Sequence, residues 1–143
     1  MNKFTLLFLA LSISLFAQDL KIRNETFPAS QMQAQNVTVA KMSAEALSKD
    51  LPHTIDKYTT LQSVTSQGPT MIYTFLINSG SKSDEAIKNE DKSRMKKAIT
   101  TGVCQSAKLL IAAQIDITYI YLSTKTKTEL FSFNISQKDC VGI

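Results

Sequence analysis

The chain has 143 residues, of which 43% are hydrophobic, with 16 basic and 12 acidic side chains. This length suits one domain with one hydrophobic core. The net charge is only +4 and the basic residues are scattered, so the composition does not indicate a nucleic-acid-binding protein.

The N-terminus has the pattern of a secretory signal peptide. The basic residue Lys3 is followed by an apolar run from Phe4 to Phe16 and by the small residue Ala17. As a helix this run is about 20 Å long, which is too short for a hydrocarbon core of about 30 Å. We therefore expect residues 1–17 to be removed, leaving a protein in the periplasm or outside the cell. No cysteine lies near the cleavage site, so we expect neither a membrane span nor a lipid anchor.

Cys104 and Cys140 are the only cysteines in the chain. An even cysteine count in an exported protein favours a disulfide, because the compartment is oxidising. A closely spaced redox pair is excluded, since 35 residues separate the two cysteines. The alternative of a metal pair has little support from a chain with a single histidine. The sequence therefore predicts a structural disulfide.

The first half of the exported chain predicts an arm, a helix and a hairpin. Residues 18–37 are assigned to an N-terminal arm or linker, because much of this segment is polar and without period, with only a weak strand signal near Leu20. Apolar residues recur at helical spacing over residues 38–50. The β-branched segment 59–66, a Gly-Pro turn and the apolar segment 71–77 predict two strands joined as a hairpin.

The second half predicts two helices and a second hairpin. We expect one helix over residues 83–102, with the glycine at its end as the stop, and a short one over 104–113. Strands are expected over 115–122 and 130–135. The order (β)αββααββ predicts an α+β fold, in which an antiparallel sheet of four to five strands has its helices packed on one face. We assign residues 38–143 to this single domain, with one disulfide.

The sequence offers few candidates for chemistry. His53 lies in a polar connector without a nucleophile motif, so a surface residue is favoured over a general base. Asp116 lies in an apolar strand and is either a buried acid or, as we favour, a carboxylate on the uncovered sheet face. Tyr119 and Tyr121 share one face of that strand and either stack on a ligand or, as we favour, pack in the core. We predict no enzyme activity, no catalytic residue, no cofactor and no metal site.

Three blocks of the sequence resemble a known family. They are Asp50-Leu51-Pro52 leading into Tyr58-Thr59-Thr60, a helix that runs into Cys104, and Leu109-Leu110-Ile111 followed by a tyrosine-containing strand and Cys140-Val141-Gly142-Ile143. These blocks resemble the small α/β pilotins of the type II secretion system, which escort and stabilise the secretin, the multimeric outer-membrane channel. They also resemble a wider group of short periplasmic proteins with the same cysteine frame.

The resemblance implies a sheet flanked by helices, a disulfide between Cys104 and Cys140, and a surface that receives a helical segment of a secretin subunit. Such docking places a helix in a groove and involves no catalysis. Those pilotins begin with a lipidated cysteine, whereas Ala17-Gln18 takes that place here.

Two hypotheses of function follow. The leading one is a soluble periplasmic, non-enzymatic protein that binds or stabilises an envelope partner such as a secretin subunit. The alternative is a periplasmic binder of a small ligand, or an inhibitor of an enzyme, with Tyr119 and Tyr121 as the expected contacts. The sequence does not identify individual partner-contact residues.

Overall fold

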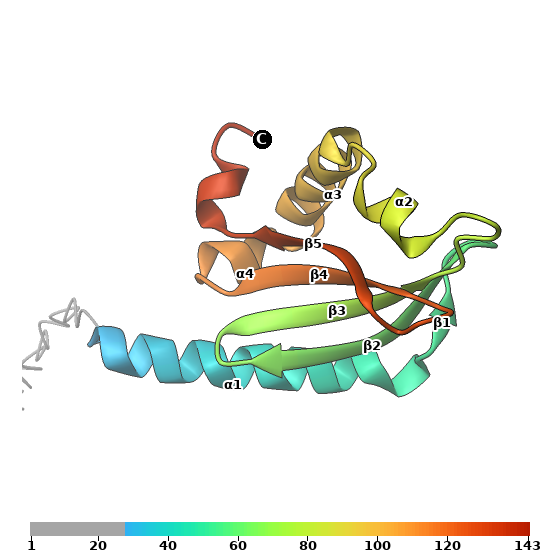
Figure 1. Cartoon of the computed structure of the whole chain (residues 1–143). Helices are drawn as coiled ribbons and strands as arrows, with labels where there is room; N and C mark the ends of the chain where they lie inside the picture. The colour runs from blue at the N-terminus through green and yellow to red at the C-terminus, as the bar shows by residue number, and fades with distance from the viewer. Residues whose placement is uncertain (1–27) are drawn as a thin grey trace, which may run out of the picture.

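The computed structural model describes residues 28–143, so the predicted signal peptide and the strand signal near Leu20 lie outside the described residues (Figure 1). The helices are α1 (Ala29–Leu47), α2 (Asp84–Lys88), α3 (Ser93–Ser106) and α4 (Lys108–Ala112), with the short 3-10 helices η1 (Ser48–Asp50) and η2 (Gln137–Cys140). The strands are β1 (His53–Thr54), β2 (Thr59–Gln67), β3 (Thr70–Ile77), β4 (Asp116–Ser123) and β5 (Glu129–Ile135). Over the described part of the chain, no helix has the length and apolar character to cross a membrane.

The five strands form one sheet in the order β1-β2-β3-β4-β5. Neighbouring strands are antiparallel except β3 and β4, which run parallel. The predicted α+β class with one disulfide is confirmed, but the expectation of a purely antiparallel sheet is wrong at this central pair. Parallel strands require a long crossover, and the connection through α2, α3 and α4 supplies it.

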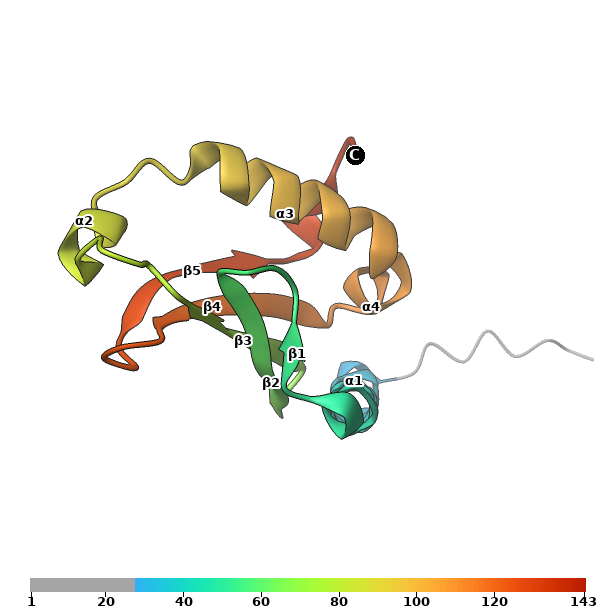
Figure 2. The same cartoon turned by 90° about the vertical axis from the view of Figure 1, so that its right-hand side faces the viewer.

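Cross-strand rows show which face of the sheet carries the core. Phe75 of β3 lies between Leu61 of β2 and Tyr121 of β4, and Tyr121 pairs in turn with Phe131 of β5. The buried side chains of this face pack with α3 and α4 at one edge and with α1 at the other. Figure 2 shows these three helices around the same side of the twisted sheet, which confirms the prediction of helices on one face.

Helix α1 is longer than the sequence predicts. It begins at Ala29, so the expectation that the arm or linker extends over 29–37 is wrong. Alanine and glutamine are good helix formers, and they make up much of this first half. The buried face consists of Ala40 and Ala44, with exposed fractions of 0% and 2%. Because the face that packs on the sheet is made of small residues, it gives little apolar periodicity.

The helix predicted over 83–102 is divided in two, and Gly102 does not end it. Residues 89–92 separate α2 from α3, and the Asp91 carboxylate there accepts a hydrogen bond from the Ser93 backbone N–H at 2.9 Å. The acidic residue therefore satisfies an N-terminal donor of α3. At the other end α3 continues to Ser106, because Val103 and Cys104 are buried in the core.

The first predicted hairpin is confirmed as β2 and β3. Gly68 occupies its turn with φ of +56°, a conformation that glycine adopts at low cost at the first central position of a type II′ turn. The connector that contains His53 forms one further short strand, since His53 and Thr54 pair with Leu61 and Thr60 of β2.

Candidate partner-binding site

The residues considered for catalysis do not come together. His53 is exposed on the edge strand β1, three strands from β4, and pairs with Leu61 near the start of β2. Asp116 begins β4 and pairs with Thr70, at the opposite end of the sheet. Within residues 28–143 no cluster of three or more histidine, cysteine or carboxylate side chains could hold a metal ion. These side chains therefore form no acid–base pair.

Tyr119 and Tyr121 lie in the core rather than in a ligand pocket. The Tyr121 ring stacks on Phe75 at a centroid distance of 4.9 Å and on Phe131 at 4.6 Å, and Tyr119 packs against Tyr73 at 5.1 Å. Burial raises the pKa of both Tyr119 and Tyr121 above the ordinary tyrosine value. The core-packing interpretation, which the sequence analysis favours, therefore describes these residues, and neither tyrosine lines the pockets described below.

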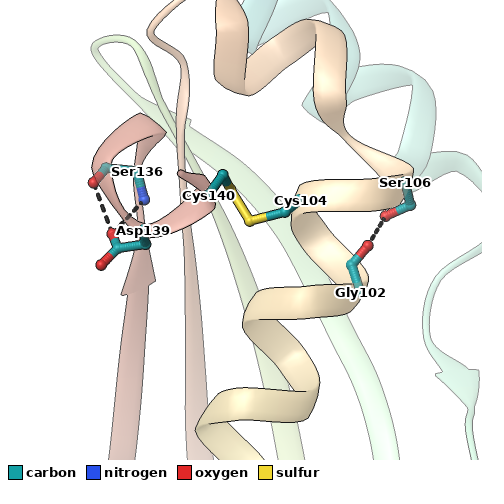
Figure 3. The surroundings of a disulfide bond; sticks show 6 residues. All are labelled: Gly102, Cys104, Ser106, Ser136, Asp139 and Cys140. Carbon is teal, nitrogen blue, oxygen red and sulfur yellow. Dashed lines mark hydrogen bonds between the residues drawn. A yellow bond between two sulfur atoms is a disulfide. The ribbon is translucent and has the colours of Figure 1, made fainter. Parts of the chain in front are cut away.

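The disulfide joins Cys104 near the end of α3 to Cys140 at the end of η2 (Figure 3). The two Cα atoms are 5.4 Å apart, within the usual range for a disulfide. At the start of η2, the Asp139 carboxylate accepts hydrogen bonds from the Ser136 backbone N–H at 2.9 Å and from the Ser136 hydroxyl at 2.7 Å. This capping box and the bridge together hold the C-terminal segment against α3.

A groove of about 340 Å³ runs between α1 and α4, and we call it the α1–α4 groove. Its lining residues are mostly apolar and none is charged: Met32, Gln35, Asn36, Val39, Leu109, Leu110, Ala113 and Ile115. Ile115 is fully buried, whereas Leu109 is 86% exposed and Met32 is 48% exposed. The groove therefore has a buried apolar base and exposed apolar side chains.

Asn36 fixes the geometry of this groove. Its side-chain amide donates a hydrogen bond of 2.6 Å to the carbonyl of Ala113, just past the end of α4. An adjoining pocket of about 270 Å³ shares Met32 and Asn36 with the groove and also has no charged lining residue. The two depressions thus form one uncharged surface along the N-terminal half of α1.

Sequence reasoning did not identify this surface. The sequence pattern shows Leu109 and Leu110 only as part of an apolar block, and it assigns Met32 to the arm or linker. One signal was available: Leu109, Leu110 and Ile111 are consecutive, and a helix of five residues cannot direct three consecutive side chains to the same face. The structure buries Ile111 and exposes Leu109.

Solved structures that align over most of this chain show the class of fold. A pilotin of the Vibrio vulnificus type 2 secretion system, EpsS, aligns with a TM-score of 0.65 and 11% identity over 80% of this chain and 99% of the pilotin. The Vibrio cholerae type II secretion pilotin AspS aligns with a TM-score of 0.60 and 14% identity, over 78% of this chain and 97% of AspS. The protein therefore has a pilotin-like fold, as the sequence resemblance predicts.

A Pseudomonas aeruginosa protein described as secreted, PA3611, aligns with a TM-score of 0.69 and 17% identity, over 79% of this chain and 99% of that one. The family model of a Domain of unknown function (DUF8479) matches residues 34–131, so the chain belongs to this family. The matched segment contains all of the α1–α4 groove except Met32. No curated protein matches the sequence.

Proposed function

We propose that this protein is a non-enzymatic binding protein of the bacterial envelope. It holds an apolar helical segment of a partner, such as a secretin subunit, in the α1–α4 groove. The observation that carries the proposal is Leu109, which is 86% exposed at the edge of an uncharged groove. The pilotin-like fold supports a secretion-system partner over other envelope proteins.

The groove suits an amphipathic helix for physical reasons. Burying a fully exposed leucine or methionine side chain contributes roughly 1.5–3 kcal/mol, and Leu109, at 86% exposed, has most of this area to lose, whereas Met32, at 48%, has about half. Since no charged side chain lines the groove, an apolar helix face would bind without desolvating an ion. The exposed leucine and methionine therefore act as anchors, and the uncharged lining favours an apolar partner face.

The proposal places the protein in the periplasm, after export directed by residues 1–17. The apolar run and the small residue before Gln18 support this location. Because Ala17-Gln18 stands where the lipidated cysteine of pilotins lies, the proposed protein acts on its partner without a lipid anchor.

Affinity capture from envelope extract of the source organism tests the proposal, with three forms of the tagged protein compared. Leu109→Glu places a charge at the edge of the groove, and Ile55→Glu is the matched control because Ile55 is 53% exposed and lies outside the groove. We expect the wild type and the control to recover the secretin subunit and Leu109→Glu to lose it. Equal recovery by Leu109→Glu, or no secretin with the wild type, would contradict the proposal.

A further inference from the structure

The two edges of the sheet are built differently. One edge is formed by β1, which has two residues and follows Pro52. The part of β2 beyond β1 is held by η1, because the Ser48 hydroxyl donates a hydrogen bond of 2.6 Å to the carbonyl of Val64. A very short strand, a proline and a covering element are devices that keep a sheet edge from pairing with another chain, and this edge has all three.

The other edge is β5, which is the outermost strand in Figure 1 and has seven residues. It contains no proline and no lysine, and Glu129 at its start is its only charged residue. The register shift against β4 lies at Leu122, so the segment 131–135 pairs regularly. Within residues 28–143 no strand pairs with the outer side of β5.

The helices contact β5 on one face and leave its outer residues exposed. The Lys92 ammonium group, just before α3, lies 4.9 Å from the centre of the Phe131 ring, and Phe133 packs in the same core as α3. Ser132 and Asn134 alternate with these aromatic residues and are both exposed. The open edge of β5 is therefore accessible along its regular part.

The hydrogen bonds of β4 show which backbone groups of β5 point outward. The Asp116 N–H donates to the carbonyl of Pro69 on the β3 side, whereas the Ser123 N–H donates to the carbonyl of Thr128 on the β5 side. Backbone groups of successive residues point to opposite sides of a strand. The odd-numbered residues of β4 therefore direct their N–H and C=O groups toward β5.

The free groups of the edge belong to Ser132 and Asn134. Tyr119 of β4 pairs with Phe133, so the backbone groups of Phe133 point inward to β4 and those of its two neighbours point outward. No described residue forms a hydrogen bond with the backbone N–H or C=O of Ser132 or Asn134 on that outer side. Both residues thus present a donor and an acceptor to an incoming strand.

We propose that β5 pairs antiparallel with β5 of a second copy of this chain, which joins the two sheets into one. The two-fold axis passes beside Phe133, so that Ser132 of each copy lies opposite Asn134 of the other. Each of these two pairs exchanges both of its N–H···O bonds, as a hydrogen-bonded antiparallel pair does. The contact is isologous, because the same residues are used by both copies.

The charges near β5 favour this antiparallel arrangement. A parallel pair would place Glu129 beside Glu129 of the second copy, and like charges opposite each other are destabilising. The antiparallel pair places the two carboxylates at opposite ends of the contact. Lys138, which follows β5 in η2 and is exposed, then lies near Glu129 of the second copy. The strand is therefore complementary to itself in charge and in backbone hydrogen bonding.

The size of the contact sets the expected strength. One strand pair is at the small end of the range for specific interfaces, so we expect a dimer that exchanges with the monomer. The dimer has two α1–α4 grooves. In a clause that rests on the proposed function, it presents two binding sites to a multimeric partner such as a secretin, which raises the overall affinity without a new contact.

Sedimentation velocity of the exported chain, residues 18–143, tests the proposal. We expect a monomer–dimer equilibrium with a midpoint of roughly 10–500 μM. Ser132→Lys should raise this midpoint at least about tenfold, because lysine within an edge strand opposes pairing. Thr65→Lys is the matched control, since Thr65 is an exposed polar residue of β2, away from β5, and it should dimerise as the wild type does.

Amide hydrogen exchange of the wild type is a second measurement that needs no variant. The amides of Ser132 and Asn134 should exchange more slowly above the midpoint concentration than below it. A chain that stays monomeric at 1 mM, equal midpoints for Ser132→Lys and Thr65→Lys, or exchange of both amides that does not depend on concentration would each overturn the proposal. Slowing of these amides only after addition of envelope extract would assign the edge to a strand of another protein, and would also overturn it.

This test is separate from that of the proposed function. Ser132→Lys changes no residue of the α1–α4 groove, and Leu109→Glu changes no residue of β5. A monomeric chain that still captures the secretin subunit would contradict only the dimer, and a dimer that captures no secretin would contradict only the proposed function.

Discussion

The helix-covered face of the sheet contains two cores that are built differently. The disulfide-side core joins aromatic and branched side chains of the sheet to α3 and α4: Phe75, Val103, Cys104, Ile111, Ile117, Tyr121, Phe133 and Ile135. The α1-side core is smaller and includes two alanines: Ala40, Ala44, Val64, Met71 and Ile115. The first core has a covalent cross-link at its edge, and the second is covered by α1, which has no such cross-link.

The difference indicates where the molecule can adapt. Helix α1 is held by its alanine face, by the hydrogen bond from Asn36 to Ala113, and by a 2.6 Å hydrogen bond from the Ser48 hydroxyl to the carbonyl of Val64. Few large apolar side chains hold it, so we expect α1 to open at a lower free energy than the disulfide-side core. The α1–α4 groove lies at this boundary, where a partner can order the more adaptable element.

Removing the cross-link should have the largest effect. A Cys104→Ala/Cys140→Ala variant loses a bridge that closes a loop with a sequence separation of 36, worth about 4 kcal/mol in the chain-entropy model. Chemical denaturation under oxidising conditions measures the loss. A denaturation curve identical to that of the wild type would show that the bridge does not stabilise the disulfide-side core.

Truncation of Met71 should be the next largest effect, and it acts on the α1-side core. Met71 is fully buried, so Met71→Ala should lower the free energy of unfolding by about 3 kcal/mol through lost burial and a cavity. Met42→Ala is the control, because Met42 is 64% exposed and its truncation should stay within about 0.5 kcal/mol. If the two variants have equal stability, α1 does not bury Met71 as described.

Loss of the Asn36 hydrogen bond should cost less. Asn36→Ala leaves the carbonyl of Ala113 without this donor, and we expect about 1 kcal/mol of destabilisation with faster hydrogen exchange in α1. Gln35→Ala, at a neighbouring lining residue, provides the reference. Unchanged exchange in α1 after Asn36→Ala would mean that this bond does not hold the helix in place.

The smallest effect should be a pH-dependent one at η2. Hydrogen bonds from the Ser136 hydroxyl and then from its backbone N–H lower the pKa of Asp139. Because the folded-state pKa is depressed, the stabilisation is present above the unfolded-state value of about 3.9 and is lost as the pH falls through the folded-state pKa. Asp139→Asn should therefore melt below the wild type at neutral pH, and the gap should close in acid. A gap independent of pH would contradict this account.

The strands were predictable because their pattern comes from burial. Only β5 alternates clearly in the sequence, with Phe131, Phe133 and Ile135 at every second position, whereas β3 and β4 carry apolar residues at both parities and are recognised by their β-branched and aromatic residues. The parallel direction of β3 and β4 was not predictable, since it depends on where the connecting helices pack. The break between α2 and α3 was also not predictable from the sequence. Its capping interactions involve polar residues, and polar residues are also common within helices.

The binding surface was less predictable than the fold. The first half of α1 contains mainly alanine, glutamine and other small or polar residues, so nothing in its periodicity indicates a helix with a groove beside it. Leucine is usually a core residue, so the sequence alone suggests that Leu109 is buried. Only the position of α4 in the folded chain shows that it is exposed. A sequence pattern indicates which residues are apolar, whereas exposure of an apolar residue is a property of the folded chain.

Calorimetric titration with a peptide that spans the C-terminal helical segment of the source organism's secretin measures partner binding at the α1–α4 groove. We expect saturable binding to the wild type and to Ile55→Glu, and at least about tenfold weaker binding to Leu109→Glu, because an apolar anchor is lost and a charge is introduced. Equal affinity for all three forms, or no binding to the wild type, would contradict the assignment of the α1–α4 groove as the partner site.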